Sequence, residues 1–326
     1  MTSHYRPPCP CCADRAIFQK RQRGEQGVLD AIKPKRTTIW LYLLIPVALF
    51  VFSVFVPLLT AVYLSFFELK SGQTIYTAVF NGVENYKALI TDSIFWKSFW
   101  NNIYLVIVCI IGQIGLAFVF VLFANSKLAV GKAVHRTFGF FPSTISAVCI
   151  GLIWSIIFHS KYGLLNWFVV NVLGGTKQAW LGDANHVMLY VSIPLVWQYI
   201  GYYMVILFSA IAGIDQEIFE SAEIDGANGF KKAIHITLPM IRPTMLVCLT
   251  LCIAGNMKAF DSIWTMTAGG PGYSSYVMAL YGYTTSFQQS NLGYGSAISV
   301  GIFVLSLLVI GGSQAIIKRA TRGLEG

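Results

Sequence analysis

Six long apolar segments constrain this chain more than any other feature. Their expected bounds are residues 39–67, 99–124, 138–158, 187–211, 244–265 and 295–316. A helix crosses the hydrocarbon core of a bilayer in roughly 20 residues, whereas the strands of a membrane barrel alternate in runs of about ten. Because lipid offers the backbone no hydrogen-bonding partner, each segment must pair its own peptide groups as a helix. We therefore predict an all-α polytopic membrane protein with six transmembrane helices.

Composition and charge support this class and give it an orientation. The chain of 326 residues is 56% hydrophobic and 11% charged, with a mean hydropathy of +0.63, which does not suit a soluble domain. Seventeen of the 23 Lys and Arg residues lie in the two tails and in the loops after the second and fourth segments, and five lie in the other loops. The positive-inside rule therefore predicts that both termini and the loop 212–243 are cytoplasmic. This asymmetry accounts for the net charge of +9, so we expect no nucleic-acid partner.

Two regions follow from the same pattern: a basic tail over residues 1–37 and a six-helix membrane domain over 38–320. The tail is polar and Pro-containing, and we expect most of it to be disordered. It carries Cys9, Cys11 and Cys12, which a reducing cytoplasm would keep as thiols. Neither a histidine nor a fourth cysteine is spaced to complete a zinc site with them. We predict no metal, and the role of these cysteines stays open.

The loop 212–243 is too polar and charge-dense to be a simple turn. Residues 215–217, Asp-Gln-Glu, favour the start of a helix because acidic side chains stabilise its first turn. Gly226 can end that helix in a left-handed conformation. A second short helix is predicted over about 228–236, ended by Pro239 and Pro243. We expect two short helices joined at a glycine.

Polar residues inside the apolar segments indicate an interior rather than a lipid face. The second segment holds Gln113 between two glycines, which favours close helix packing. The fifth holds Asn256, Lys258 and Asp261, and a charge at membrane depth costs on the order of 3 kcal/mol. Lys258 and Asp261 are three residues apart, so on one continuous helix they could form an ion pair.

Two external connections have distinctive patterns. In residues 159–186, the Gly-Leu-Leu-Asn-Trp run at 163–167 and the Trp-Leu-Gly-Asp run at 180–183 are typical of a helix and a turn lying in the membrane interface. The connection 266–294 contains no Lys, Arg, Asp or Glu, and its Gly-Gly-Pro-Gly at 269–272 should break any helix.

The loop 212–243 also matches a family pattern. Glu220-Ser221-Ala222, Gly226 four residues later and Ile236-x-Leu238-Pro239 stand at the spacing and in the topological position of a known motif. This segment resembles the coupling loop of bacterial ABC importer permeases, the membrane subunits of binding-protein-dependent uptake systems.

Further runs narrow the resemblance to the carbohydrate branch. The chain is similar to sugar permeases of the maltose-permease-F type in four short stretches, and the resemblance extends over about residues 38–320, the six-span core. These stretches are Gly163–Asn166, Lys258–Ile263, Thr267–Pro271 and Gly293–Ala297.

The resemblance implies a fold, a set of partners and a cellular location. It implies the type I ABC importer permease fold in a bacterial inner membrane and a path formed with a second permease for a sugar, di- or oligosaccharide. A solute-binding protein, periplasmic or lipid-anchored, would deliver the sugar. Two cytoplasmic ATPases would use ATP and Mg²⁺, since this chain has no Gly-x4-Gly-Lys-Ser/Thr loop and no cofactor of its own is expected.

The resemblance also implies site residues. The implied ATPase-coupling residues are Glu220, Ser221, Ala222, Asp225, Gly226, Leu238 and Pro239. The resemblance aligns Gln198, Tyr199, Tyr202, Cys252, Gly255 and Asn256 with sugar-contacting positions. Side-chain chemistry adds Trp197, Lys258 and Asp261, so the predicted substrate path offers aromatic stacking and hydrogen bonds to sugar hydroxyls. The residue types at Cys252 and Gly255 do not carry a substrate identity over, so the sugar itself is not predicted.

Three alternatives remain at this point. The same machinery could move another polar solute, such as a glycerol phosphodiester. An intramembrane enzyme is remote, because His-Glu-x-x-His and Gly-x-Ser-x-Gly elements are absent and Asp261 has no second intramembrane carboxylate. A sensor or assembly protein could use the loop only for docking.

Overall fold

The computed structural model describes residues 36–70, 73, 77–125 and 137–322 and divides the chain into two units after Thr60. In the first unit α2 (Arg36–Phe50) continues through a π-helical turn, η1 (Val51–Phe55), into α3 (Val56–Leu64). Together they form a 28-residue apolar helix, Thr37–Leu64, which is long and apolar enough to cross a bilayer. The tail 1–37 and its three cysteines lie almost wholly outside the described residues.

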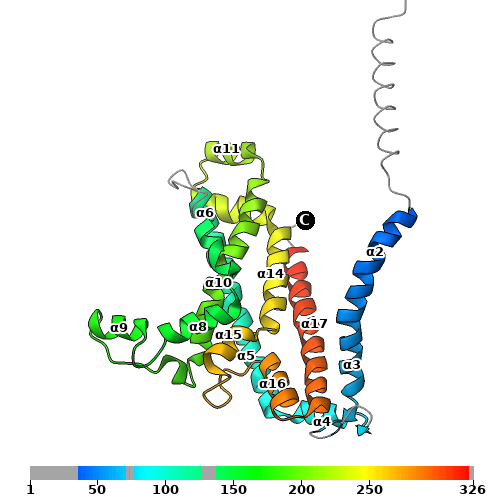
Figure 1. Cartoon of the computed structure of the whole chain (residues 1–326). Helices are drawn as coiled ribbons and strands as arrows, with labels where there is room; N and C mark the ends of the chain where they lie inside the picture. The colour runs from blue at the N-terminus through cyan, green and yellow to red at the C-terminus, as the bar shows by residue number, and fades with distance from the viewer. Residues whose placement is uncertain (1–35, 71–72, 74–76, 126–136, 323–326) are drawn as a thin grey trace, which may run out of the picture. The chain divides into compact units, whose positions relative to one another are not determined.

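In the second unit three more helices are long and apolar enough to cross a bilayer. They coincide with the predicted second, fourth and sixth segments, apart from earlier starts at Ser93 and Leu292. Their bounds are α5 (Ser93–Cys109) with η3 (Ile110–Gly115) and α6 (Leu116–Asn125), then α10 (Val187–Ala212), and α17 (Leu292–Arg322). α14 packs against α10, α17 and α5, and Figure 1 shows α10, α14 and α17 running side by side.

The third and fifth segments differ from the prediction of single straight helices. The third bends by 101° between Thr137–Thr144, which ends in η4 (Phe141–Thr144), and α8 (Ala147–Ile157). The fifth is α14 (Arg242–Met257) alone, and α15 (Asp261–Thr267) is a separate helix that packs along α8. The described residues therefore contain four unbroken candidate spans, or up to six when each bent helix pair counts as one.

Shorter elements close the two ends of this bundle. The loop helix α11 lies at one end, and α4 and α16 lie at the other (Figure 1). The only strands of the described residues are two residues long and pair antiparallel, so the all-α class holds. These elements are β1 (Phe67–Glu68), β2 (Val79–Phe80), α4 (Glu84–Thr91), α9 (Leu164–Asn171), η5 (Trp180–Gly182), α11 (Gln216–Ile224), α12 (Gly229–Lys232), η6 (Ala233–Thr237), α13 (Leu238–Met240), α16 (Met278–Tyr283) and η7 (Thr284–Gln288).

Glycines allow the bent third segment to lie against α10. A Cβ on Gly201 of α10 would overlap the backbone carbonyl of Gly139, so the two backbones touch at this crossing. A Cβ on Gly112 would come within 2.6 Å of Val196, which agrees with the close packing predicted for the second segment. Small residues therefore fix where these elements cross.

A second fixed point is Asp92, which joins three helices at the end of the bundle opposite α11. Its Oδ1 accepts hydrogen bonds from the amides of Ile94 (2.8 Å) and Phe95 (3.2 Å) and so caps α5. Its Oδ2 accepts the hydroxyl protons of Tyr281 on α16 and Tyr294 on α17, both at 2.5 Å. Burial alone would raise the pKa of Asp92, but these hydrogen bonds outweigh it and hold the pKa below its ordinary value.

Substituting Gly201 by alanine should destabilise the fold, because the new methyl group meets backbone that cannot rotate away. We expect a loss of about 1–3 kcal/mol, the usual range for overpacking, seen as a lower melting temperature of the purified chain in detergent. Gly311→Ala is the matched control, since a Cβ on this glycine of α17 meets nothing within 4 Å. Equal melting temperatures for the two variants would contradict the close crossing.

Asp92→Asn should lower stability at neutral pH and flatten its dependence on acid. A carboxylate whose folded pKa is depressed contributes fully above the unfolded pKa, about 3.9, and loses this contribution as the pH falls through the folded value. Melting temperatures measured across this acidic range should therefore fall less steeply for Asp92→Asn than for the wild type. Glu84→Gln, which removes an exposed carboxylate nearby in sequence, is the control for the loss of one negative charge.

Candidate functional site

The loop between α10 and α14 is an ordered two-helix element. Its first helix, α11, ends in a Schellman motif: the amide of Ala227 donates to the carbonyl of Ala222 (2.9 Å), and that of Gly226 to the carbonyl of Glu223 (3.1 Å). Gly226 has a φ of +76°, a conformation that side chains disfavour. The predicted role of this glycine as the stop of the first helix is therefore confirmed.

An ion pair and a cap hold the second helix against the first. Lys232 of α12 places Nζ 2.8 Å from Oε1 of Glu223 on α11, and its side chain is only 19% exposed. Asn228 caps α12 by accepting from the amide of Lys231 at 2.9 Å. The two helices are thus tied by the Gly226 turn and by the Glu223–Lys232 ion pair.

The second helix is longer than predicted. Gly229–Met240 is one continuous helical segment, in which the π-helical turn η6 precedes Pro239, and the bend of 76° falls at Ile241. The expectation that the helix ends before Pro239 was wrong, since it continues through the π-helical turn η6 and Pro239 to Met240. Pro243 stands at the start of α14, where its missing N–H is tolerated.

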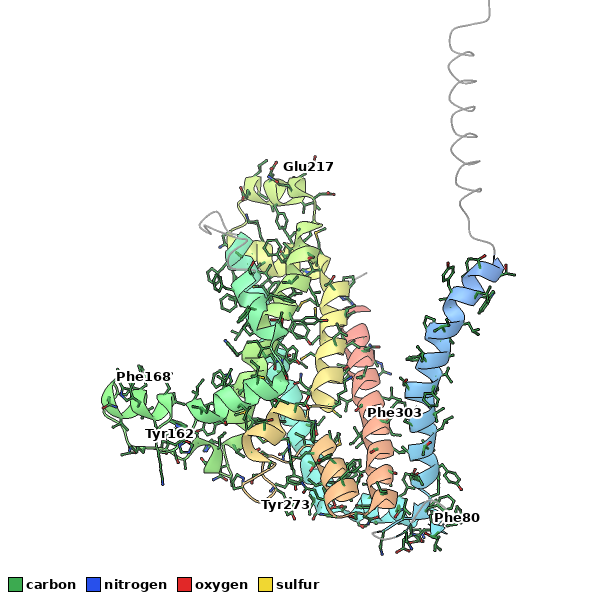
Figure 2. All side chains as sticks on the ribbon, viewed as in Figure 1. Phe80, Tyr162, Phe168, Glu217, Tyr273 and Phe303 are labelled. Atoms are coloured by element: carbon green, nitrogen blue, oxygen red, sulfur yellow. The ribbon has the colours of Figure 1, made fainter. Side chains whose placement is uncertain are left out.

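The predicted coupling residues divide by exposure. Glu220, Ser221, Asp225, Gly226 and Pro239 are exposed, Leu238 is half-buried and Ala222 is buried. Glu217 adds a further exposed carboxylate to α11, which Figure 2 labels at the tip of the molecule. Glu220 accepts a hydrogen bond from Gln216 Nε2 (2.8 Å), one turn earlier on the helix. The loop therefore presents an acidic outer surface on a fixed frame.

Inside the bundle, buried amides connect the predicted path residues to other helices. Asn102 of α5 donates to the carbonyls of Asn256 (2.9 Å) and Met257 (3.2 Å), where α14 ends, and accepts from the amide of Met278 (2.8 Å). Cys252 lies 3.4 Å from Oε1 of Gln113. These contacts lie on surfaces where helices meet.

Four of the five predicted path residues on or after α14 fall on two sides. Cys252 and Asn256 are buried at 0% and 5% exposure, one helical turn apart. Gly255 and Lys258 are exposed and extend a stripe that begins with Val247 and Leu251 at the same spacing. This structure therefore places Cys252 and Asn256 in helix packing and leaves Gly255 and Lys258 on an open face.

The predicted path residues on α10 are divided in the same manner. Trp197 and Tyr202 are 40% and 37% exposed, Tyr199 is half-buried, and Gln198 is buried at 2%. Gln198 donates from Nε2 to the carbonyl of Ile145 (3.0 Å) at the bend of the third segment, while its Oε1 has no hydrogen-bond partner.

Lys258 and Asp261 do not form the ion pair that their spacing allowed. Lys258 follows the last residue of α14 and Asp261 begins α15, so no continuous helix places them on one face. Both are exposed, and no ion pair between them occurs in the described part of the chain. The pairing prediction was wrong because it required the fifth segment to run unbroken.

Trp197 also lines a cavity of about 740 Å³ between α6, the third segment and α10. Its walls are apolar, and the Trp197 indole is the one side chain there with a hydrogen-bonding group. Sugar recognition needs several polar groups, so this cavity by itself does not suit a saccharide. Within the described residues, no group of three or more His, Cys, Asp or Glu side chains could hold a metal ion.

Sequence reasoning missed the residues that hold these elements in place: Asp92, Asn102 and Gln198 in its role at the bend. Asp92 could have been found, since an aspartate directly before a helical apolar run is a typical N-cap. The contacts of Asn102 and Gln198 join residues 53 to 176 positions apart, and no local pattern encodes them.

Comparison with known proteins assigns the chain to a family. Residues 121–323 match the model of the family described as "Binding-protein-dependent transport system inner membrane component". This stretch includes the whole α11–α14 element.

Two curated relatives align over most of the chain. The "Sulfoquinovosyl glycerol transport system permease protein SmoG" of Agrobacterium fabrum is 30% identical over 82% of this chain and 86% of its own length. The "Multiple sugar-binding transport system permease protein MsmF" of Streptococcus mutans is 30% identical over 82% and 90%.

A solved structure shares the fold. It is a bacterial alginate ABC transporter in complex with an alginate pentasaccharide-bound periplasmic protein. One of its chains superposes with a TM-score of 0.75 over 87% of this chain and 95% of its own length, at 20% identity. At this identity the likeness supports the fold alone.

Breaking the Glu223–Lys232 ion pair should loosen α11 without unfolding the bundle. The pair is partly exposed, and such pairs contribute about 0.2–1 kcal/mol, so Lys232→Gln should raise amide exchange in α11 up to about fivefold. Amide hydrogen exchange is measured in α11 for Glu223→Gln, Lys232→Gln and the double variant, and the three rates together give the coupling free energy between the two side chains. Lys231→Gln, which changes the exposed neighbouring lysine, is the control. Equal amide exchange of α11 in the Lys231→Gln and Lys232→Gln variants would contradict the role of the Glu223–Lys232 ion pair.

Proposed function

The chain belongs to the family of binding-protein-dependent transport system inner membrane components, and on this basis we propose that it forms half of a saccharide path in an ATP-driven importer. Members of this family are transport subunits rather than enzymes, and the apolar helices make this a multi-pass inner-membrane protein. The observation that carries the proposal is the ordered, acidic two-helix loop that joins α10 to α14.

The loop can transmit force because it is stiff and continuous with two spans. A partner that pushes on α11 acts on α10 directly and on α14 through the Gly226 turn, the Glu223–Lys232 ion pair and the helix Gly229–Met240. Glu217, Glu220 and Asp225 suit a basic cleft on a cytoplasmic ATPase, where charge-assisted hydrogen bonds are strong. In this proposal two ATPases bind and hydrolyse ATP with Mg²⁺, the loop and both termini are cytoplasmic, and closure of the ATPases switches access to the path.

A saccharide is the proposed cargo because the relatives' names specify carbohydrates or glycosides. The exposed faces of α10 and α14 carry Trp197, Tyr202 and Lys258, which can stack on sugar rings and bind hydroxyl groups. In this chain alone those faces are open, so a second permease is proposed to close the path. A solute-binding protein would deliver the sugar to the end of the bundle opposite α11.

Ligand-dependent ATP hydrolysis tests this proposal. The chain is reconstituted in proteoliposomes with its second permease, two ATPases and solute-binding protein, and the ATPase rate is measured with di- and oligosaccharides, a glycerol phosphodiester and an amino acid. We expect one class of saccharide to stimulate hydrolysis severalfold. Stimulation by non-sugar solutes alone would overturn the saccharide proposal while leaving the importer intact.

Two glycine variants test the loop in the same assay. Gly226→Val forces a side chain into a φ of +76°, whereas Gly229→Val, three residues on, has no positive φ; a Cβ at either position meets nothing within 4 Å. Since the left-handed conformation costs about 1–2 kcal/mol, Gly226→Val should reduce the ratio of stimulated to basal hydrolysis severalfold, and Gly229→Val should retain it. Full stimulation of both variants would contradict the coupling role.

A further inference from the structure

The connection between α8 and α10 forms a compact hairpin built around Asn166. This side chain, 1% exposed, donates to the carbonyls of Ser160 (3.0 Å) and Gln178 (2.8 Å) and accepts from the amide of Gln178 (2.9 Å) and the indole of Trp180 (3.1 Å). Leu165 and Trp180 pack against the main hydrophobic core. The hairpin is therefore fixed to the bundle, and the surface that it presents is equally fixed.

That outward surface is apolar. Leu164, Trp167 and Phe168 of α9 are 64%, 57% and 44% exposed and lie on the side of the helix away from Asn166. Val172 and Leu173, directly after α9, are also exposed, at 56% and 66%. Such a patch on a fixed element marks an interaction site.

We propose that this surface of α9 is a membrane-interface anchor that lies in the leaflet at the end of the bundle opposite α11 and takes anionic lipid headgroups through Lys161 and Lys177. The helix α8, which contacts α9, carries further exposed apolar side chains, including Leu152 (51%) and Ile156 (60%). Aromatic side chains prefer this depth of a bilayer.

The direction of α9 suits a helix lying in the interface plane. In Figure 1 it extends from α8 away from the bundle and runs across the direction of α10, α14 and α17. In Figure 2 Phe168 lies on the side of α9 that faces the α11 end, which is the direction of the bilayer interior. An amphipathic helix in an interface places its apolar face toward the acyl chains in this manner.

The charges fit anionic headgroups. Lys161 and Lys177 are exposed, and no ion pair of either occurs among the described residues. Residues 159–182 contain no Asp or Glu, and Asp183 is already bonded to His186 at 2.6 Å. Lys177 adjoins Gln178, which bonds to Asn166 on the inner side of α9, so the lysine-bearing segment lies on the opposite side from Trp167. The hairpin thus has an apolar layer and a cationic layer.

Depth-dependent quenching tests the position of Trp167. The assembled complex is placed in phosphatidylcholine–phosphatidylglycerol vesicles whose acyl chains carry bromine either close to the headgroup or near the chain end. The Trp167 component is the fluorescence difference between the wild type and Trp167→Phe, a conservative change at an exposed position. We expect this component to be quenched more strongly by bromine close to the headgroup.

Two results of that experiment would overturn the proposal. Absence of quenching from either bromine position would place α9 outside the lipid. Quenching in the isolated chain that disappears in the assembled complex would show that a protein partner, the second permease or the solute-binding protein, covers the surface instead.

Lipid selectivity tests the lysines independently. Because each lysine near an anionic surface contributes about 1 kcal/mol, Lys161→Gln with Lys177→Gln should reduce the phosphatidylglycerol retained by the purified protein by up to about fivefold per lysine. Native mass spectrometry counts the retained lipid. Lys87→Gln is the control, because that lysine is paired with Glu84. Equal retention by the double variant and the wild type would overturn the role of the lysines.

Discussion

Peptide groups freed where a helix breaks inside a bilayer must find partners within the protein, and the rest of this structure depends on how that is done. Side-chain amides provide the partners. Asn102 donates to the two carbonyls at the end of α14 and accepts from the first amide of α16, and Gln198 donates to the carbonyl of Ile145 at the bend of the third segment. Asn166 does the same where α8 ends. Because these bonds replace those that a straight helix would make, the chain can be bent without leaving exposed polar backbone in lipid.

The bends explain why the loop helix α11 can act on the interior. A flexible connection would absorb a push from a partner, whereas this loop meets α14 through a helix that breaks only at Ile241, next to the buried side of the bundle. At the other end, Asp92 holds α5, α16 and α17 together.

Features of the fold that depend on composition and local pattern could be predicted from the sequence. Features that depend on contacts between residues far apart in the chain could not. Four of the six spans and the Gly226 stop follow from apolar length and from the conformational freedom of glycine. The bend at Ile145 was not predicted, although Pro142, Ser143 and Thr144 interrupt the apolar run there. The hydrogen bond that Gln198, 53 positions away, donates to the carbonyl of Ile145 is encoded by no local pattern. At the end of α14 the sequence does offer a local sign, since Lys258 and Asp261 interrupt the apolar run, but the hydrogen bonds that Asn102 donates to the last two carbonyls come from a residue 154 and 155 positions away. The spacing of apolar residues indicates which side chains are shielded from water, but it does not indicate where a helix bends.

Gly255 and Asn256 illustrate why candidate path residues cannot be assigned from sequence position alone. They are neighbours, yet one lies on the open stripe of α14 and the other is held between helices by Asn102 and by its own bond to the carbonyl of Cys252 (2.8 Å). If the path runs along the open stripe, Asn256 affects it by fixing the end of α14, and therefore the position of Lys258, rather than by touching cargo. A substitution at Asn256 would then alter transport of every substrate alike, whereas one at Gly255 would change the shape of the path and so the choice among substrates.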